Sequence, residues 1–441
     1  MSVLKKTFFF LAFAALGYGG YYGYTFASIG AGYAAKAACS CVYVSGRSLE
    51  SVVAEDLYVV KGIGTTTLDR ANRSATTRVL GVASKTAVYR EGLGCTLLNG
   101  VTAEELRAQP GFLKTKVQPS LLPTASPGSS EVDTAALQKT LAWAFAEPDP
   151  ARIVRTRAVV VLHRGQLVAE RYAPGITAQT PLTGWSMTKS VTNALVGLLV
   201  KDGKLAVDKP APLAEWQGDE RRQITTDNLL RMSSGLKFDE NYGDVSDATR
   251  MLFLEKGAGA YALKSPLAHP PGTEWSYSSG TTNILQEIIR RQFKSYAEYL
   301  AFPHQRLFQK IGMSSAVLEP DAAGTYVGSS FLFATARDWA RFGQLYLQDG
   351  VWNGERLLPE GWVAYSARET PHADERYAAQ FWVYPRQWGL PADLFMANGF
   401  EGQLVLVVPS KQLVLVRLGC TPNEQDFDER RFLKEIVAAV K

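Results

Sequence analysis

Histidine, cysteine and net charge are scarce in this sequence, and each scarcity excludes a class of protein. The 441 residues include four histidines and four cysteines, without a Cys-x-x-Cys pair, a His-Glu-x-x-His motif or a phosphate-binding Gly-Lys-Ser/Thr loop. We therefore expect no metal site and no cofactor. The formal net charge is +5, and Lys5, Lys6 and Lys36 supply three of those charges within an N-terminal segment free of acidic residues. The remainder is close to neutral, so no nucleic-acid partner is expected.

The composition is that of a folded globular protein. Hydrophobic residues make up 46% of the chain and charged residues 20%, which excludes disorder, collagen-like repetition and coiled coil for most of the length. A chain of this length is expected to form about two or three domains and can bury a large core without disulfide bonds.

The N-terminus carries an uncharged stretch over residues 7–35, preceded by Lys5 and Lys6. It is long enough to span a bilayer as a helix. We predict an uncleaved signal anchor, a transmembrane segment of residues 1–36. The alternative is a signal peptide with Phe8–Leu16 as its apolar region and cleavage near Ala35-Lys36-Ala37, a site rather far from Leu16. Either places the body outside the cytoplasm of a bacterial cell: anchored in the inner membrane and facing the periplasm, or secreted.

The cysteines are consistent with export. Cys39, Cys41 and Cys95 lie in the first 95 residues, and the fourth is Cys420. Disulfides persist in oxidising compartments. We therefore expect Cys39 or Cys41 to bond to Cys95, which would tie the segment after the anchor to the body. The alternative is four free thiols.

The rest of the chain divides into three predicted parts. Residues 37–117 contain short β-branched runs and form a small extension, and residues 118–135 form a linker rich in proline and serine. The main domain covers residues 136–441, with a helical subdomain at about 205–330.

Inside the main domain, hairpins are predicted near both ends, at residues 158–172 and 403–418, with a helix outside each, at 137–146 and 428–440. Strands at both ends of a mainly helical middle predict a single α+β unit. It would consist of an antiparallel sheet flanked by terminal helices, with the helical subdomain inserted.

Ser186 and Lys189 form the first candidate for chemistry. They stand one helical turn apart at the start of a helix predicted to run to about Lys201. A serine hydroxyl becomes a good nucleophile when a nearby base removes its proton. Lysine can be that base if desolvation or a neighbouring cation lowers its pKa. A Ser-x-x-Lys pair can also arise by chance on a solvated helix. Here, however, residues 190–200 are uncharged, which predicts that the helix and Lys189 are buried. Lysine is rarely buried without a specific role or partner.

Two later segments add to this pair. A turn-rich loop at residues 269–280 contains Tyr277-Ser278-Ser279, whose tyrosine could relay a proton or could simply be a packed aromatic residue. Ala397-Asn398-Gly399 enters a predicted strand, and its glycine would permit close approach of backbone to a ligand. On its own, this last segment is equally consistent with a plain turn.

Together, in this order and spacing, the three segments resemble the motifs of the serine β-lactamase and penicillin-binding-protein superfamily, over about Leu137 to Lys441. The class C β-lactamase-like branch, which includes esterases and 6-aminohexanoate-dimer hydrolases, is most similar. Phe238–Tyr242 and the pair Trp185-Ser186 particularly resemble the latter group.

The resemblance implies a β-lactamase-like fold and a serine hydrolase. Ser186 would be the acylated nucleophile, Lys189 its general base and Tyr277 the proton shuttle. The backbone N–H groups of Ser186 and Phe400 would form the oxyanion hole. The implied contacts to a small-molecule ester or amide substrate are Tyr242, Trp185, Ser279, Asn398 and Gly399.

Two departures from the penicillin-recognising pattern shift the expected substrate. Ala397-Asn398-Gly399 replaces a Lys-Thr-Gly or His-Thr-Gly sequence, and Tyr277-Ser278-Ser279 lacks the usual asparagine. An ester or small amide is therefore favoured over a β-lactam. The alternatives are a true β-lactamase or D-Ala peptidase, and a non-catalytic penicillin-binding-like sensor. A Ser-His-Asp triad is not indicated, because the histidines are scattered and no Gly-x-Ser-x-Gly elbow occurs.

Overall fold

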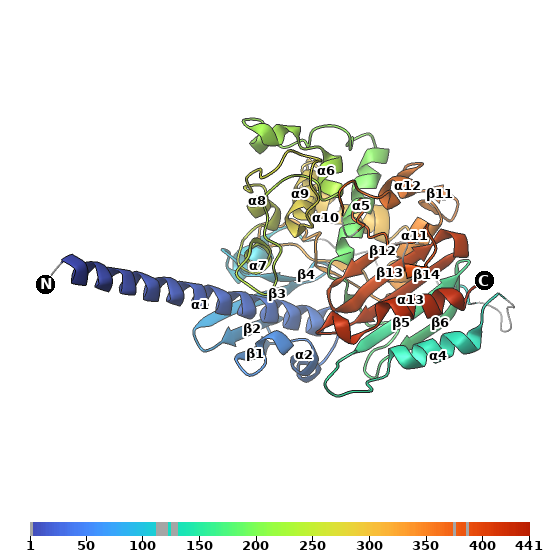
Figure 1. Cartoon of the computed structure of the whole chain (residues 1–441), viewed down its shortest axis with the longest axis horizontal. Coiled ribbons are helices and arrows are strands. Elements are labelled where there is room, and N and C mark those ends of the chain that lie inside the picture. The colour runs from blue at the N-terminus through green and yellow to red at the C-terminus, as the bar shows by residue number, and fades with distance from the viewer. Residues whose placement is uncertain (1–2, 112–121, 125–130, 374–375, 385–387) are drawn as a thin grey trace.

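A five-stranded antiparallel sheet in the order β12-β13-β14-β5-β6 forms the centre of the main domain (Figure 1). The computed structural model describes residues 3–111, 122–124, 131–373, 376–384 and 388–441, with side chains from Gly19 onward. The two predicted hairpins are present, and β14 pairs with β5, which joins the two ends of the domain. The strands are β5 (Thr156–His163), β6 (Gln166–Tyr172), β12 (Phe395–Gly399), β13 (Gln403–Val408) and β14 (Leu413–Gly419).

Helices cover both faces of this sheet. The terminal helices α4 (Thr134–Ala144) and α13 (Glu429–Ala438) pack together on one face, where Leu137 and Phe432 join a fully buried cluster. Helix α11 (Ala336–Leu347) packs against β14 on the other face. The structure thus confirms the predicted α+β architecture of an antiparallel sheet flanked by terminal helices.

The chain between β6 and β12 is mainly helical, as predicted. Strands β7, β8 and β9 form a small three-stranded sheet in the order β7-β9-β8, and β10 and β11 form a two-stranded one. The elements are β7 (Leu182–Thr183), α5 (Met187–Lys201), α6 (Thr226–Leu230), α7 (Asp247–Phe253), α8 (Ala258–Ala262), α9 (Ser279–Arg290), α10 (Tyr296–Pro303), β8 (Val317–Leu318), β9 (Leu332–Ala334), β10 (Val351–Trp352), β11 (Glu355–Arg356) and α12 (Trp362–Ala367).

The N-terminal extension is a four-stranded antiparallel sheet packed on a long helix. The helix α1 (Val3–Tyr43) projects from the body at its N-terminal end and enters it at its C-terminal end, alongside β2 and β3 (Figure 1). The remaining elements are α2 (Leu49–Glu55), the 3-10 turn η1 (Tyr58–Val60), β1 (Gly64–Asp69), β2 (Ser74–Val79), β3 (Ala83–Arg90), β4 (Gly94–Leu97) and α3 (Ala103–Ala108). The predicted linker at 118–135 lies mostly outside the described residues.

The predicted membrane segment of residues 1–36 is not supported. In the part of the chain that the structure describes, no helix is both long enough and apolar enough to cross a bilayer. From Ala27 onward, α1 is instead packed into the protein, and small side chains such as Ala31 and Ala34 are fully buried. Lys36 is buried as well and forms an ion pair with Glu319 of the main domain. The small residues of α1 from Ala27 onward therefore serve close packing inside the protein.

A disulfide fixes this helix to the extension sheet. Cys39 of α1 bonds to Cys95 of β4, which confirms one of the two predicted pairings. Cys41 and Cys420 are buried free thiols. The backbone N–H of Cys95 also donates a 2.6 Å hydrogen bond to Glu319. The disulfide and the Glu319 carboxylate together link α1, β4 and the main domain.

Gly32 tests how tightly α1 is packed. A Cβ atom there would lie 2.9 Å from the carbonyl oxygen of Phe253 in α7, closer than side chains come to backbone. We predict that Gly32→Val lowers the free energy of unfolding by about 1–3 kcal/mol, because the two helices must move apart. Urea unfolding measures this, with Gly20→Val as the control, since a Cβ at Gly20 meets nothing within 4 Å. Equal midpoints for the two variants would contradict close packing.

Candidate active site

Ser186 and Lys189 face each other at the start of α5. Ser186 is the N-cap residue, and the Lys189 Nζ lies 2.9 Å from the Ser186 Oγ. Lys189 is only 1% exposed, whereas Ser186 is half-buried and reachable. The same amine donates to the Ser279 Oγ at 3.0 Å and to the Ser329 carbonyl oxygen at 3.1 Å. These contacts hold the amine against the serine hydroxyl.

Burial lowers the pKa of the Lys189 amine, which makes it a better general base near neutral pH. Desolvation lowers the pKa of Lys189 from 10.5 to about 8, while the negative charge of Glu240 opposes the shift. With that pKa, roughly a tenth of the lysine is neutral at pH 7. A base whose pKa lies near the working pH is effective in general base catalysis.

Tyr277 lies close to both Ser186 and Lys189. The Lys189 Nζ lies 4.8 Å from its ring centroid, and Tyr277 lines the same cavity as Ser186. Burial raises the pKa of Tyr277 well above its ordinary value, so the phenol remains protonated and can donate a proton. Packing against Tyr377 and Trp382, with ring centroids 5.6 and 5.4 Å away, holds the ring in place.

Glu240 connects this site to Tyr242 and Ser279, although it belongs to none of the three motifs. Its carboxylate accepts hydrogen bonds from the Ser279 Oγ at 2.5 Å, the Ser279 backbone N–H at 2.8 Å and the Tyr242 hydroxyl at 2.8 Å. Ser279 therefore stands between a carboxylate and the Lys189 amine. The signal available in the sequence was that Glu240 lies two residues before Tyr242.

The Glu240 charge predicts a pH effect. Because this carboxylate raises the pKa of Lys189, Glu240→Gln should lower that pKa further. The acid limb of kcat/KM, which follows deprotonation of Lys189, should then move to lower pH. A pH–rate profile measures the shift. Asp244→Asn, which neutralises an acid that lines the cavity at Ser186, serves as control. An acid limb of Glu240→Gln that stays in place or moves upward would contradict the assignment.

Gly399 brings the end of β12 against the nucleophile. A Cβ there would lie 2.3 Å from the Gly184 carbonyl oxygen and 3.2 Å from the Ser186 backbone nitrogen. Its φ of −144° is open to any residue, so it is the close approach that requires glycine. The approach sets the backbone of Gly399 beside that of Ser186, and the predicted oxyanion hole combines the Ser186 N–H with the N–H of the next residue, Phe400.

Trp185 is held from two directions that the sequence did not reveal. Its indole N–H donates to Glu401 at 3.0 Å, and burial raises the pKa of Glu401 to about 7. On the other side Tyr33 of α1 stacks on the indole, with centroids 6.2 Å apart and planes within 4°. The extension thus contacts the residue immediately before the nucleophile.

A cavity of about 940 Å³ opens onto Ser186. Most of the predicted site residues line it, whereas Lys189 and Ser279 lie behind its wall and reach the site through their hydrogen bonds. The lining residues among those predicted are Trp185, Ser186, Tyr242, Tyr277, Asn398, Gly399 and Phe400. In the described part of the chain, no group of His, Cys, Asp and Glu side chains could hold a metal ion.

The comparisons with known proteins fit this geometry. The Beta-lactamase family model matches residues 146–439. A 6-aminohexanoate-dimer hydrolase of Paenarthrobacter ureafaciens is 26% identical over 294 residues, which cover 61% of this chain and 73% of that protein. The matched region begins after the N-terminal extension.

Solved structures share the fold at low identity. A Bacillus anthracis protein assigned provisionally as a 6-aminohexanoate-dimer hydrolase superimposes with a TM-score of 0.60 at 23% identity, covering 74% of this chain and 90% of that one. A family VIII carboxylesterase gives a TM-score of 0.53 at 14% identity, with coverage of 72% and 99%.

Proposed function

Since the chain belongs to the β-lactamase family and is a serine hydrolase of that superfamily, we propose that it cleaves ester or small amide bonds through an acyl-enzyme on Ser186. The observation that carries this proposal is the 2.9 Å contact between the buried Lys189 amine and the Ser186 hydroxyl. An amine taken out of water and directed at a hydroxyl matches the requirement of an activated nucleophile.

In the proposed first step, the Ser186 Oγ attacks the substrate carbonyl carbon while Lys189 takes the hydroxyl proton. The backbone N–H groups of Ser186 and Phe400 bind the developing oxyanion, and a donor of this kind contributes about 3 kcal/mol to the transition state. Tyr277 gives its proton to the departing alcohol or amine and regains one from Lys189. The carbonyl–leaving-group bond breaks, leaving the acyl group on Ser186.

In the second step, a water molecule attacks the acyl-enzyme carbonyl. The Lys189 and Tyr277 pair accepts the proton of that water and returns one to the Ser186 Oγ as the ester bond breaks. The acid product leaves, and the free serine is restored.

The cavity supports esters and small amides over β-lactams. Neither lysine nor arginine occurs among the described residues that line it. The carboxylate of a β-lactam would therefore find no cationic partner at Asn398 and Gly399, where the penicillin-recognising enzymes carry one. Joint presence of Ser186, Lys189 and Tyr277 in contact also counts against a sensor that has lost catalysis. The Cys39–Cys95 disulfide supports an oxidising, extracytoplasmic setting.

Covalent trapping tests the proposal directly. The full chain is incubated with a fluorophosphonate probe and with a panel of ester, amide and β-lactam substrates, then digested and analysed by mass spectrometry. We expect the probe adduct on the peptide carrying Ser186 and hydrolysis of esters or small amides. An adduct at another residue, or no adduct with any compound, would overturn the acyl-enzyme on Ser186.

Tyr277→Phe should separate amides from activated esters. An amine leaving group must be protonated, whereas p-nitrophenolate leaves without a proton, so we expect about a 10²–10⁴-fold loss on amides and much less on p-nitrophenyl esters. Steady-state kcat/KM on both substrates measures it. Tyr377→Phe is the control, because Tyr377 packs on Tyr277. Equal losses on both substrates would contradict the relay.

A further inference from the structure

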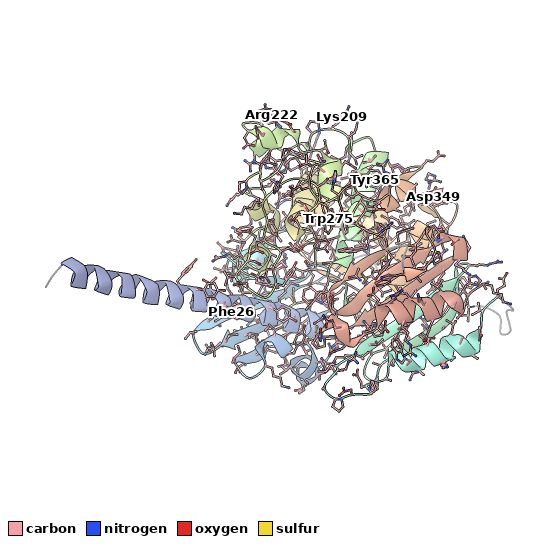
Figure 2. All side chains as sticks on the ribbon, in the orientation of Figure 1. Phe26, Lys209, Arg222, Trp275, Asp349 and Tyr365 are labelled. Atoms are coloured by element: carbon pink, nitrogen blue, oxygen red, sulfur yellow. A yellow bond between two sulfur atoms is a disulfide. The ribbon has the colours of Figure 1, made fainter. Side chains whose placement is uncertain are left out.

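The N-terminal extension forms one wall of the cavity at Ser186. Phe26 of α1, Val59 of η1, Ile63 and Leu80 all line it together with the nucleophile. Figure 2 marks Phe26 where α1 reaches the globular body. None of these residues falls within the region that the family model matches, residues 146–439. This wall is therefore an addition to the hydrolase domain.

The side chains of the wall are apolar and open to solvent. Phe26, Val59, Ile63 and Leu80 are between 44% and 62% exposed, and Phe400, which lines the same cavity, is 42% exposed. Single exposed apolar residues are ordinary on a protein surface, but a contiguous group around a cleft marks a binding surface.

The charges at this cavity narrow the class of ligand. Asp244 and Glu424 are the charged side chains among the described lining residues, and burial raises the pKa of Glu424. An anionic group would therefore find no cationic partner among these described lining residues. A neutral apolar chain would meet complementary surface from Leu80 and Ile63 inward to Trp185, on which Tyr33 of the extension stacks.

We propose that this wall binds a long apolar chain of the substrate, so that the enzyme acts on esters or amides that carry such a chain next to the scissile bond. The inference rests on the proposed function and names its substrate class. A cavity of about 940 Å³ is at the large end of small-molecule sites. It leaves room for a chain beyond the reacting carbonyl.

Two substrate series measure the effect on the full-length protein. The first is p-nitrophenyl esters from acetyl to decanoyl, and the second is acetate esters of alcohols from ethanol to decanol, so that the chain lies on the acyl side or on the leaving-group side. We expect kcat/KM to rise about fourfold per methylene in one series, in proportion to the apolar surface buried. The series that responds shows which side of the bond faces the wall.

Leu80→Asp places a charge in the wall and should flatten this rise while leaving acetyl esters unaffected. Leu80 has a positive φ of 52°, a conformation that Asp tolerates well. The matched control is Val82→Asp, since Val82 is 63% exposed in the same turn between β2 and β3 but does not line the cavity. Ile63→Asp provides a second variant on the wall, and thermal unfolding confirms that each variant is folded.

The outcomes distinguish this inference from the proposed function. If Ser186 is acylated and short esters are cleaved, but both series are flat or Leu80→Asp and Val82→Asp respond alike, the chain-binding wall is overturned and the hydrolase stands. If no substrate or probe acylates Ser186, the proposed function fails, and the substrate class falls with it.

Discussion

Ser186→Ala should abolish ester turnover and covalent labelling, a loss on the order of 10⁵-fold or more in kcat. The Lys189 amine contacts the Ser186 Oγ at the cavity, whereas the Ser279 hydroxyl, which the same amine also contacts, lies behind the cavity wall. Initial rates with a p-nitrophenyl ester, together with intact-protein mass spectrometry, measure both losses. Near-wild-type activity in this variant would reject Ser186 as the nucleophile.

Lys189→Met should leave at most trace acylation while keeping the protein folded. Methionine fills most of the buried volume and removes an amine that is costly to bury, so we expect the thermal midpoint to be unchanged or higher. The rate of acylation in a stopped-flow burst measures the loss of the base. Lys201→Met, at the exposed end of α5, is the matched control and should acylate normally.

The sheet and its terminal helices could be predicted because their signals are local. Two runs rich in apolar and β-branched residues with Arg164 and Gly165 between them specify a hairpin, and both turn residues have the positive φ that a two-residue loop requires. Helical spacing places Phe432 and Ile436 on one buried face of α13. Such patterns depend on neighbours a few residues apart, which the sequence displays directly.

The role of α1 could not be predicted, because a bilayer and a protein interior select similar residues. An uncharged run of small and apolar side chains suits both. Two contacts of α1 show that this part of the helix lies in the protein interior. Lys36 pairs with a carboxylate 283 residues away in the chain, and Gly32 lies against α7. Neither contact has any local signature.

The residues of the candidate site also fall into two groups, those with a local signal in the sequence and those without one. Ser186 and Lys189 are one helical turn apart, so their contact follows from spacing, whereas Tyr277 was assigned from the resemblance to a family. The tertiary fold brings Glu240, Glu401 and Tyr33 to the site. Glu240 raises the pKa of Lys189, while Glu401 and Tyr33 contact Trp185. Motifs thus indicated the residues proposed to react, whereas the residues that contact them from other parts of the chain emerged from the structure.

Gly399→Ala should reduce kcat by about 10²–10³-fold, which corresponds to the loss of one oxyanion donor. It should also lower the free energy of unfolding by about 1–3 kcal/mol, because the new methyl group meets backbone. The added methyl group would lie 2.3 Å from the Gly184 carbonyl oxygen, so the end of β12 must shift away from Ser186 and carry the Phe400 N–H with it. Because the oxyanion forms in the transition state, kcat should fall while KM stays near its original value.

A matched glycine separates this effect from general disturbance of the cleft. Gly243→Ala, next to Tyr242, meets only the side chain of Asn241 at 3.4 Å and should retain full activity. Fluorophosphonate labelling of Gly399→Ala should slow in parallel with kcat, since that reaction also develops negative charge on an oxygen beside Ser186. If Gly399→Ala kept its full kcat, the strand end would not be held against the nucleophile, and Phe400 would lose its place in the oxyanion hole.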